Sequence, residues 1–285
     1  MGPQQLTWRW RVFAAVVIAG TRLLGWRVDV QGLEHVPRRG GAVLAFNHHS
    51  YLDFVMVAWG PVRLLQRPVR FLAKREILRS RKVGWIARAA GAVPVDRGST
   101  RARADAFAAA GEALRQGDLV AVAPEQTISR SFELLPMRTG AARMAQLAGT
   151  PIVPVVGWGT QRVLTKGSRP SLRRRLPVTL RFGEPIGVAV DDDVRRVTEV
   201  LQGRMSSMLD EVQRTYPDGT PAGAPWVPAR LGGSAPSHDE VLRDHQQRAD
   251  GWADPPAGGG PAPHGSAADR SLEPDDPSEP GSTPG

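Results

Sequence analysis

One short apolar run that ends abruptly in polar residues constrains the fold of this chain more than any other stretch. Residues 41–46 are small or branched apolar residues, a pattern typical of a buried strand. The polar stretch 47–50, Asn-His-His-Ser, interrupts this run, and the apolar residues 54–59 that follow predict a helix. In open α/β sheets, ligands bind in the crevice where strands end. The sequence therefore predicts a functional site that includes His48.

His48 lies five residues before Asp53, and the two side chains suggest a catalytic pair. An imidazole held by a carboxylate has a fixed tautomer and can act as a general base near neutral pH. The chain has no cysteine, and no Gly-x-Ser-x-Gly pattern marks a serine nucleophile. We therefore expect the substrate to supply the attacking hydroxyl.

Two other interpretations of these residues stay open at this point. Ser50-x-x-Asp53 also fits a capping box, in which Asp53 would only satisfy backbone N–H groups at a helix start. A metal site would need a second cluster of His, Asp or Glu, and the sequence offers none. No metal is predicted.

The fold class follows from the alternation of apolar runs along the chain. We expect an α/β fold with a layered, mostly parallel or mixed sheet flanked by helices. The helix that follows the polar stretch 47–50 should begin at residue 54 and end at Gly60-Pro61. Further strands are predicted at 26–31, 69–73, 92–95, 119–123, 152–156 and 178–182, and further helices at 83–90, 100–116, 140–147 and from about 191 to 216.

Three regions are predicted from composition. Residues 1–26 place Trp8, Trp10 and Trp26 among arginines around a short apolar run, which favours an amphipathic helix in a membrane interface or packed on the domain. Residues 27–216 form the α/β domain. Residues 217–285 are rich in Pro, Gly, Ser and Asp, which predicts a disordered acidic tail.

Charge is divided unevenly between these regions. Residues 1–216 have a net charge of +16, whereas residues 217–285 have a net charge of −7. A basic domain favours an anionic partner such as a membrane surface, a phosphorylated substrate or nucleic acid. No helix-turn-helix, zinc-finger or aromatic-basic strand pattern is present, so we expect no nucleic acid and an anionic membrane surface instead.

Polar residues also follow other predicted strands. Asp96-Arg97-Gly98 offers a fixed positive charge for a phosphate, or else forms a surface turn. Glu125 and Thr127 place a carboxylate and a hydroxyl at another strand end, or else start a helix. A basic run in a later loop would bind lipid headgroups, bind a nucleotide phosphate or simply face solvent; it consists of Lys166, Arg169, Arg173, Arg174 and Arg175.

The order of these stretches resembles the glycerolipid acyltransferase family, which includes bacterial 1-acylglycerol-3-phosphate acyltransferase. Residues 47–53 match the family's Asn-His-x-Ser-x-x-Asp block, and 95–97 resemble its second block. Residues 123–129 resemble the third block, Phe-Pro-Glu-Gly-Thr-Arg-Ser, and 151–155 match the fourth, a strand that contains proline. The four blocks occur in the expected order over roughly residues 26–215.

The resemblance implies acyl transfer from acyl-CoA or acyl-carrier protein to the free hydroxyl of a lysophospholipid, with no cofactor. His48 would be the general base and Asp53 its orienting partner. The other site residues that the match implies would contact or shape the substrate pocket: Asn47, Ser50, Arg97, Glu125 and Thr127. The enzyme would lie on the cytoplasmic face of the plasma membrane as a peripheral or monotopic protein.

The third block departs from the family pattern at two positions. Gln126 replaces its glycine and Ile128 replaces its arginine, and both positions are associated with the acceptor phosphate in family members. Loss of the arginine removes a charge-assisted anion contact, worth roughly 1.5–3 kcal/mol. The acceptor is therefore 1-acylglycerol-3-phosphate or a different lyso-lipid, glycolipid or amino-lipid. A membrane-surface binding protein that keeps the fold without the chemistry is a further alternative.

Overall fold

A seven-stranded mixed sheet forms the centre of the molecule. The computed structural model describes residues 8–74, 93–95 and 100–249. The strands are β1 (Arg27–Gln31), β2 (Ala42–Phe46), β3 (Val69–Lys74), β4 (Val93–Val95), β5 (Leu119–Val122), β6 (Ile152–Trp158) and β7 (Pro177–Phe182). Their order across the sheet is β1-β7-β6-β2-β5-β3-β4. Among these described strands, β6 and β7 are the only antiparallel pair, so the expected α/β fold with a mostly parallel, mixed sheet is confirmed.

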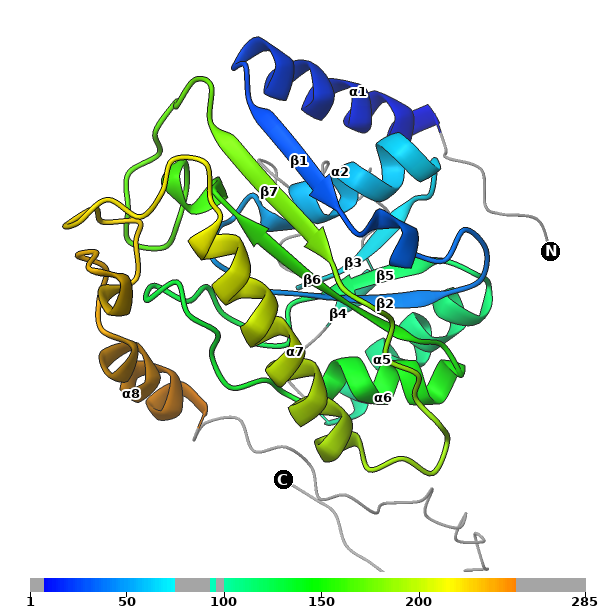
Figure 1. Ribbon diagram of the computed structural model, residues 1–285. Coiled ribbons are helices and arrows are strands. Elements are labelled where there is room, and N and C mark those ends of the chain that lie inside the picture. The colour runs from blue at the N-terminus through cyan, green and yellow to red at the C-terminus, as the bar shows by residue number, and fades with distance from the viewer. Residues whose placement is uncertain (1–7, 75–92, 96–99, 250–285) are drawn as a thin grey trace, which may run out of the picture. The chain divides into compact units, whose positions relative to one another are not determined.

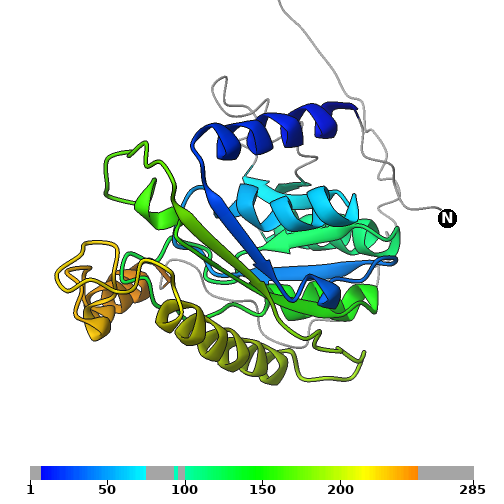
Figure 2. The same ribbon diagram turned by 45° about the horizontal axis from the view of Figure 1, so that its top comes forward.

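Helices cover both faces of this sheet (Figures 1 and 2). Their bounds are α1 (Trp8–Leu23), α2 (Asp53–Leu65), α5 (Thr100–Arg115), α6 (Gly140–Ala148), α7 (Val194–Arg214) and α8 (His238–Ala249). The described residues also form short 3-10 helices, which are η1 (Leu33–His35), η2 (Thr160–Arg162) and η3 (Ala229–Leu231). The predicted helix at 83–90 lies outside the described residues.

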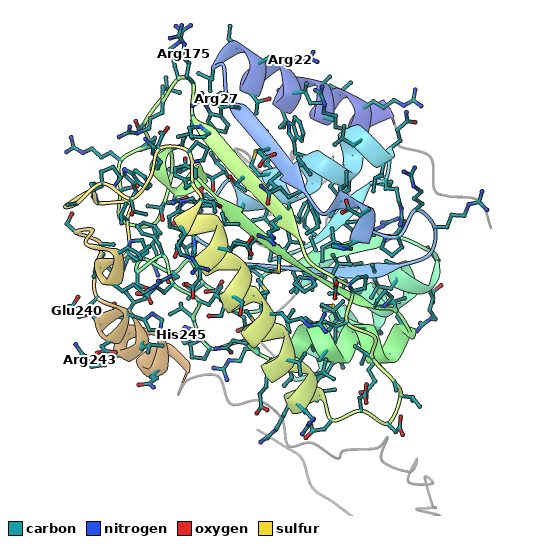
Figure 3. All side chains as sticks on the ribbon, viewed as in Figure 1. Arg22, Arg27, Arg175, Glu240, Arg243 and His245 are labelled. Carbon is teal, nitrogen blue, oxygen red and sulfur yellow. The ribbon has the colours of Figure 1, made fainter. Side chains whose placement is uncertain are left out.

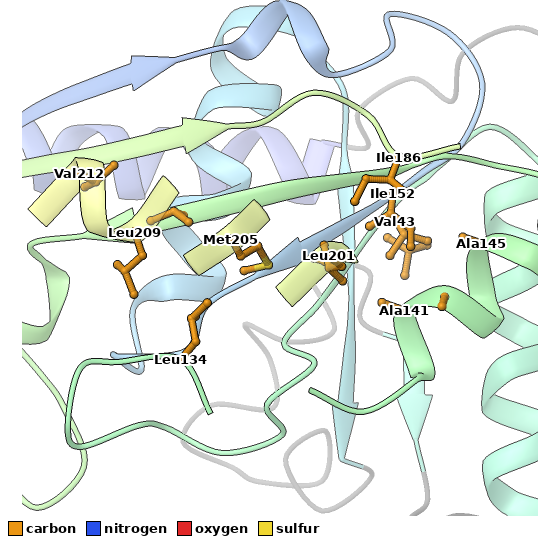
Figure 4. Close-up of a cluster of buried hydrophobic side chains, with 14 of the residues drawn as sticks. Val43, Leu134, Ala141, Ala145, Ile152, Ile186, Leu201, Met205, Leu209 and Val212 are labelled. Carbon is orange, nitrogen blue, oxygen red and sulfur yellow. The ribbon is translucent and has the colours of Figure 1, made fainter. Parts of the chain in front are cut away.

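Strand β2 separates two hydrophobic clusters because its side chains alternate between the two faces of the sheet. Val43 and Ala45 pack with α5, α6 and α7, and Figure 4 shows part of this cluster. Leu44 and Phe46 pack on the opposite face with α2. All five residues of β2 are buried, which explains why the sequence there is an unbroken apolar run.

The parallel strands bring the predicted motifs to one edge of the sheet. Strands β2, β3, β4, β5 and β6 run in the same direction, so their carboxyl ends meet at the same edge. Residues 47–53 follow β2, residues 123–129 follow β5 and residues 159–165 follow β6. This edge is therefore where the candidate site forms.

Helix α2 is longer than the sequence predicts. The prediction ends it at Gly60-Pro61, but the helix continues through Pro61 to Leu65. A Cβ atom on Gly60 would meet side chains of β1, η1 and β7 at 3.3–3.4 Å, so the glycine permits close packing here instead of ending the helix. Burial of the apolar face, including Val62, outweighs the helix-breaking tendency of proline.

The predicted disorder from residue 217 is wrong for residues 217–249. This region forms η3 and α8, and its few apolar side chains enter the core beside Tyr216. Trp226 and Val227 are 8% and 0% exposed. Average composition hides this feature, because a small number of well-placed apolar residues is enough to attach the segment. Residues 250–285 lie outside the described part of the chain.

Helix α1 packs on α2 with one face and exposes the other. Ala14, Val17 and Ile18 line its contact with α2, whereas Val16 and Leu23 are 63% and 81% exposed. Among the described residues, no helix combines the length and the apolar character needed to cross a membrane. Packing on the domain, one of the two interpretations of this helix, is thereby shown; contact with a membrane stays a prediction.

Candidate active site

His48 and Asp53 meet at the carboxyl end of β2. His48 follows the strand within two residues, and Asp53 is the first residue of α2. His48 Nδ1 lies 3.3 Å from Asp53 Oδ2, and both residues are buried, with exposures of 9% and 3%. A carboxylate only accepts hydrogen bonds, so Nδ1 carries the proton and Nε2 retains the lone pair of a general base.

Asp53 also holds the backbone of the loop that precedes α2. Its Oδ2 accepts hydrogen bonds from the N–H groups of His49 and Ser50, each at 2.7 Å. Its Oδ1 accepts a bond from the Thr160 hydroxyl at 2.8 Å. The capping and the catalytic interpretations of Asp53 are therefore compatible. The same carboxylate accepts backbone N–H groups just before the helix and also orients His48.

Aromatic rings surround the His48 imidazole. Phe54 packs edge-on at 5.1 Å between ring centroids, and Phe46 does so at 6.1 Å. These two phenylalanine rings restrict the orientation of the imidazole plane. The ring is therefore held both by a charged partner and by packing, as a preorganised base requires.

His49 is chemically different from its neighbour. It is completely buried, and this burial lowers the pKa of its imidazole to about 4. Its Nδ1 lies 3.0 Å from Asn47 Nδ2, which donates, so Nδ1 accepts and Nε2 carries the proton. His49 is a neutral part of the core, and His48 is the histidine suited to catalysis.

Glu125 binds the backbone of His48. The sequence predicts that it shapes the substrate pocket, but the structure places it in the protein interior. It is fully buried, and its two oxygens accept the backbone N–H groups of His48 and Leu135, each at 2.8 Å. Burial raises the pKa of this carboxyl to about 8, despite the two hydrogen bonds that lower it. Glu125 belongs to the scaffold because its carboxyl oxygens are engaged by the backbone.

Asn47 and Ser50, also predicted to bind substrate, are likewise parts of the scaffold. Asn47 exchanges hydrogen bonds with Gly157, at 2.7 and 3.0 Å, and so joins the ends of β2 and β6. Ser50 Oγ contacts the carbonyl oxygens of Thr160 and Leu164 at 3.2 and 2.7 Å. Contact with substrate would require these bonds to break, and both residues are buried.

The loop after β6 supplies site residues that sequence reasoning missed. Thr160 holds Asp53, as described above, and Thr165 Oγ1 donates to the His49 carbonyl at 2.7 Å. The signal was available, because residues 159–161 form another polar stretch directly after a strand. The prediction ended that strand at residue 156, two residues before its end at Trp158, and thereby hid the motif.

The remaining predicted residues have mixed outcomes. Thr127 is half-buried in the segment that follows β5, and Arg97 lies outside the described residues. Gln126 has φ +59°, a left-handed conformation that favours the glycine of the family block. Ile128, in place of the family's arginine, is 6% exposed and therefore buried.

Within the described part of the chain, no group of three or more His, Cys, Asp or Glu side chains is arranged to hold a metal ion. The expectation of a reaction without a metal or other cofactor stays a prediction.

Comparison with known proteins finds acyltransferases. The sequence model described as Acyltransferase matches residues 27–158. A chloroplastic 1-acyl-sn-glycerol-3-phosphate acyltransferase of Brassica napus is 30% identical over 145 residues, which cover 50% of this chain but only 40% of that protein. The human 1-acyl-sn-glycerol-3-phosphate acyltransferase alpha is 29% identical over 191 residues, covering 67% of this chain and 66% of its own length.

A bacterial relative and a solved structure extend the likeness. The 1-acyl-sn-glycerol-3-phosphate acyltransferase of Bacillus subtilis is 24% identical, and the match covers 66% of this chain and 90% of that protein. The crystal structure of PlsC, the 1-acyl-sn-glycerophosphate acyltransferase of Thermotoga maritima, has the same fold, with a TM-score of 0.58 at 23% identity over 73% of this chain and 82% of that chain. Residues 27–158 of this chain therefore resemble the acyltransferase family.

Proposed function

We propose that this protein is an O-acyltransferase that moves a fatty acyl group from a thioester to the free hydroxyl of a lysophospholipid. The observation that carries this proposal is the His48–Asp53 pair, held at 3.3 Å where β2 ends. The names of the three relatives described above, each a 1-acyl-sn-glycerol-3-phosphate acyltransferase, support 1-acylglycerol-3-phosphate as the acceptor and phosphatidic acid as the product of phospholipid biosynthesis.

The proposed reaction needs one base and one activated acyl group. His48 Nε2 takes the proton of the acceptor hydroxyl while the hydroxyl oxygen attacks the thioester carbonyl. The Asp53 carboxylate stabilises the imidazolium that forms. When the tetrahedral intermediate collapses, the C–S bond breaks and the imidazolium returns its proton to the departing thiolate. The donor is acyl-CoA or acyl-carrier protein, and the proposed steps require no cofactor.

A second acceptor class is favoured by the third block. Ile128 provides no charge for a phosphate, and Arg130, two residues later, forms an ion pair with Asp244 at 2.9 Å. Arg97 and Thr127 remain the residues that we propose to contact the acceptor. A glycolipid, an amino-lipid or another lyso-lipid would need fewer basic groups than 1-acylglycerol-3-phosphate does, so a panel of acceptors is required.

We further propose that the enzyme works on an anionic membrane surface, at the cytoplasmic face of the plasma membrane. The outer face of α1 exposes Val12, Val16 and Leu23. Arg22, Arg27 and Arg175 gather near the carboxyl end of the same helix, as Figure 3 shows. Apolar side chains next to arginines are suited to an interface in which the chain enters the headgroup layer and the guanidinium groups bind anionic lipid.

The test is thiol release from a long-chain acyl-CoA by purified protein with a panel of lyso-lipids. Wild type should release thiol with one acceptor class, and His48→Ala should abolish release while its circular dichroism spectrum is unchanged. Arg243→Ala, a substitution of an exposed residue on α8, is the control and should keep the wild-type rate.

Three outcomes have distinct meanings. Release by His48→Ala at the wild-type rate would exclude His48 as the base. If acyl-CoA fails, acyl-carrier protein is the next donor. Failure with both donors and every acceptor would favour the non-catalytic membrane-surface protein.

A further inference from the structure

Two irregular loops hold the backbone around the His48–Asp53 pair. In the loop 129–133, the N–H of Ser129 donates to the His48 carbonyl at 2.8 Å. In the loop 159–165, Thr160 donates to Asp53 and Thr165 donates to the His49 carbonyl. These loops lie largely outside regular secondary structure, so their positions depend on what packs behind them.

The region that packs behind them is residues 216–244, here named the C-terminal clasp. It lies beyond the segment that matches the acyltransferase family, residues 27–158. It includes η3 and most of α8, and Figure 1 shows α8 beside the green loop that precedes α6. The clasp contacts both active-site loops, through separate sets of side chains.

Arg162 joins the loop 159–165 to the C-terminal clasp. Its guanidinium carbon lies 4.2 Å from the centre of the Trp226 ring and 5.8 Å from that of Tyr216. Its Nη1 forms an ion pair with Asp218 at 2.5 Å and donates to the Tyr216 hydroxyl at 3.1 Å. The Arg162 side chain is only 9% exposed, so this charge is buried among its partners.

The loop 129–133 meets the clasp through α8. His238 Nδ1 lies 3.2 Å from Ser131 Oγ, which in turn contacts Ser129 Oγ at 3.0 Å. Arg130 forms an ion pair with Asp244 at 2.9 Å. The hydrogen-bonded path His238–Ser131–Ser129 thus ends at the residue whose N–H holds the His48 carbonyl.

Further bonds attach the same loop to the clasp and to α7. Arg230 forms an ion pair with Glu133 at 3.1 Å and a second one with Asp210 of α7. Gln213 of α7 donates to the Phe132 carbonyl at 3.0 Å. Phe132 has φ +59°, so these contacts hold a backbone conformation that a phenylalanine rarely adopts by itself.

We propose that the C-terminal clasp is a positioning element of the active site, which aligns the His48 imidazole with the Asp53 carboxylate by fixing these two loops. The inference rests on the proposed acyl transfer for its kinetic consequence. The 3.3 Å His48–Asp53 contact is longer than the 2.7–2.8 Å bonds that surround it, so small loop displacements would weaken it first. None of the clasp residues touches the reacting groups.

The test uses the full chain with Trp226→Ala, Trp226→Phe and His238→Ala. Trp226→Ala should lower kcat at least 10-fold while the KM for the thioester changes less than 2-fold, since misplacement by about 1 Å costs about 100-fold in rate. Trp226→Phe should recover most of the rate, because a ring again stacks on Arg162. Arg243→Ala, an exposed residue on the same helix α8 (Figure 3), is the control and should behave like wild type.

Amide hydrogen exchange separates this proposal from the proposed activity. In Trp226→Ala, exchange should accelerate in residues 159–165 and 129–133 while β2 and β6 keep their protection. If the wild type catalyses no transfer, the proposed function fails, and this measurement still tests the clasp.

Two results would overturn the proposal. One is a wild-type kcat in folded Trp226→Ala; the other is exchange that rises equally throughout the sheet. His238→Ala keeps the test decisive if Trp226→Ala does not fold, and it should accelerate exchange in 129–133 more than in 159–165.

Discussion

At the scale of single residues, Asp53 combines two tasks that a substitution can separate. An asparagine can keep both backbone N–H bonds through its carbonyl oxygen and donate its amide to the Thr160 hydroxyl, which also accepts. Asp53→Asn therefore removes the charge beside His48 but keeps the helix start. We expect turnover to fall roughly 1,000- to 10,000-fold. The free energy of unfolding should change by about 1 kcal/mol or less.

The two quantities are measured by turnover per folded molecule and by urea unfolding. Asp53→Ala is the comparison, because it removes every acceptor and should lose both turnover and stability. If Asp53→Asn turned over at the wild-type rate, Asp53 would act only as a helix cap.

Glu125 should make the stability of the protein depend on pH. Its pKa rises from the ordinary 4.5 to about 8 on folding, so the folded state keeps a proton that the unfolded state releases. The stabilisation is therefore complete below pH 4.5 and is lost as pH rises toward 8, at up to about 1.4 kcal/mol per pH unit. Urea unfolding of wild type and Glu125→Gln should be measured from pH 5 to 8. The free energy of unfolding of wild type minus that of Glu125→Gln should decrease along that range.

This prediction is decided by how the difference in unfolding free energy between the two proteins changes with pH, and not by its size at any one pH. Glutamine also disturbs one of the two N–H bonds that Glu125 accepts, and this cost does not vary with pH. A difference between the two proteins that stays constant from pH 5 to 8 would mean that Glu125 is ionised in the folded state.

Residues that act locally could be read from the sequence, and those that act across the fold could not. His48 and Asp53 are five residues apart, so their pairing needs only one turn of chain between a strand and a helix. Thr160 reaches Asp53 from 107 residues away, and this contact becomes visible only when β2 and β6 are placed side by side. For the same reason, Glu125 reads as a pocket residue in sequence but forms backbone bonds in the structure.

At the scale of elements, the outer face of α1 offers a direct test of membrane contact. Val16 is 63% exposed, so Val16→Glu should leave the thermal midpoint unchanged. It should weaken binding to vesicles that contain anionic lipid by roughly 10- to 100-fold or more, because a buried valine contributes about 1.5–3 kcal/mol and the new charge repels the surface. Flotation with vesicles measures the change.

A matched substitution on another helix controls for added charge. Leu147 on α6 is 57% exposed, comparable to Val16, and Leu147→Glu should bind vesicles like wild type. Equal binding by Val16→Glu and wild type would exclude α1 as the membrane contact.

Hydrophobic periodicity predicted most elements because most of them bury a full face. Leu201, Met205 and Leu209 follow one another at helical spacing and place α7 on the sheet, while Asp193 caps its first turn as the acidic residues there suggest. The end of α2 was mispredicted because local preferences of Gly60 and Pro61 are outweighed by packing. Local sequence carries no information about that tertiary contact.

At the scale of the whole molecule, the boundary of the fold lies beyond the boundary that composition suggests. Residues 217–249 are rich in proline and glycine, yet they place Trp226, Val227 and Ala235 in the same cluster as β2 and α7. Disorder predicted from average composition assumes that no apolar group finds a partner. Here Tyr216 and Arg162 are the packing partners of Trp226, and the sequence alone does not indicate this contact.

Truncation tests where the fold ends. A chain that stops at Tyr216 loses the burial of Trp226 and Val227, each worth about 1.5–3 kcal/mol, and exposes the core surface beneath them. Since domains are stable by only about 5–15 kcal/mol, we expect this chain to unfold at much lower urea or to be insoluble. A chain that stops at Ala249 keeps η3 and α8 and should unfold at a midpoint close to that of the full chain. If the chain ending at Tyr216 unfolded at the same midpoint, residues 217–249 would contribute nothing to stability, and a boundary at residue 216 would be the correct one.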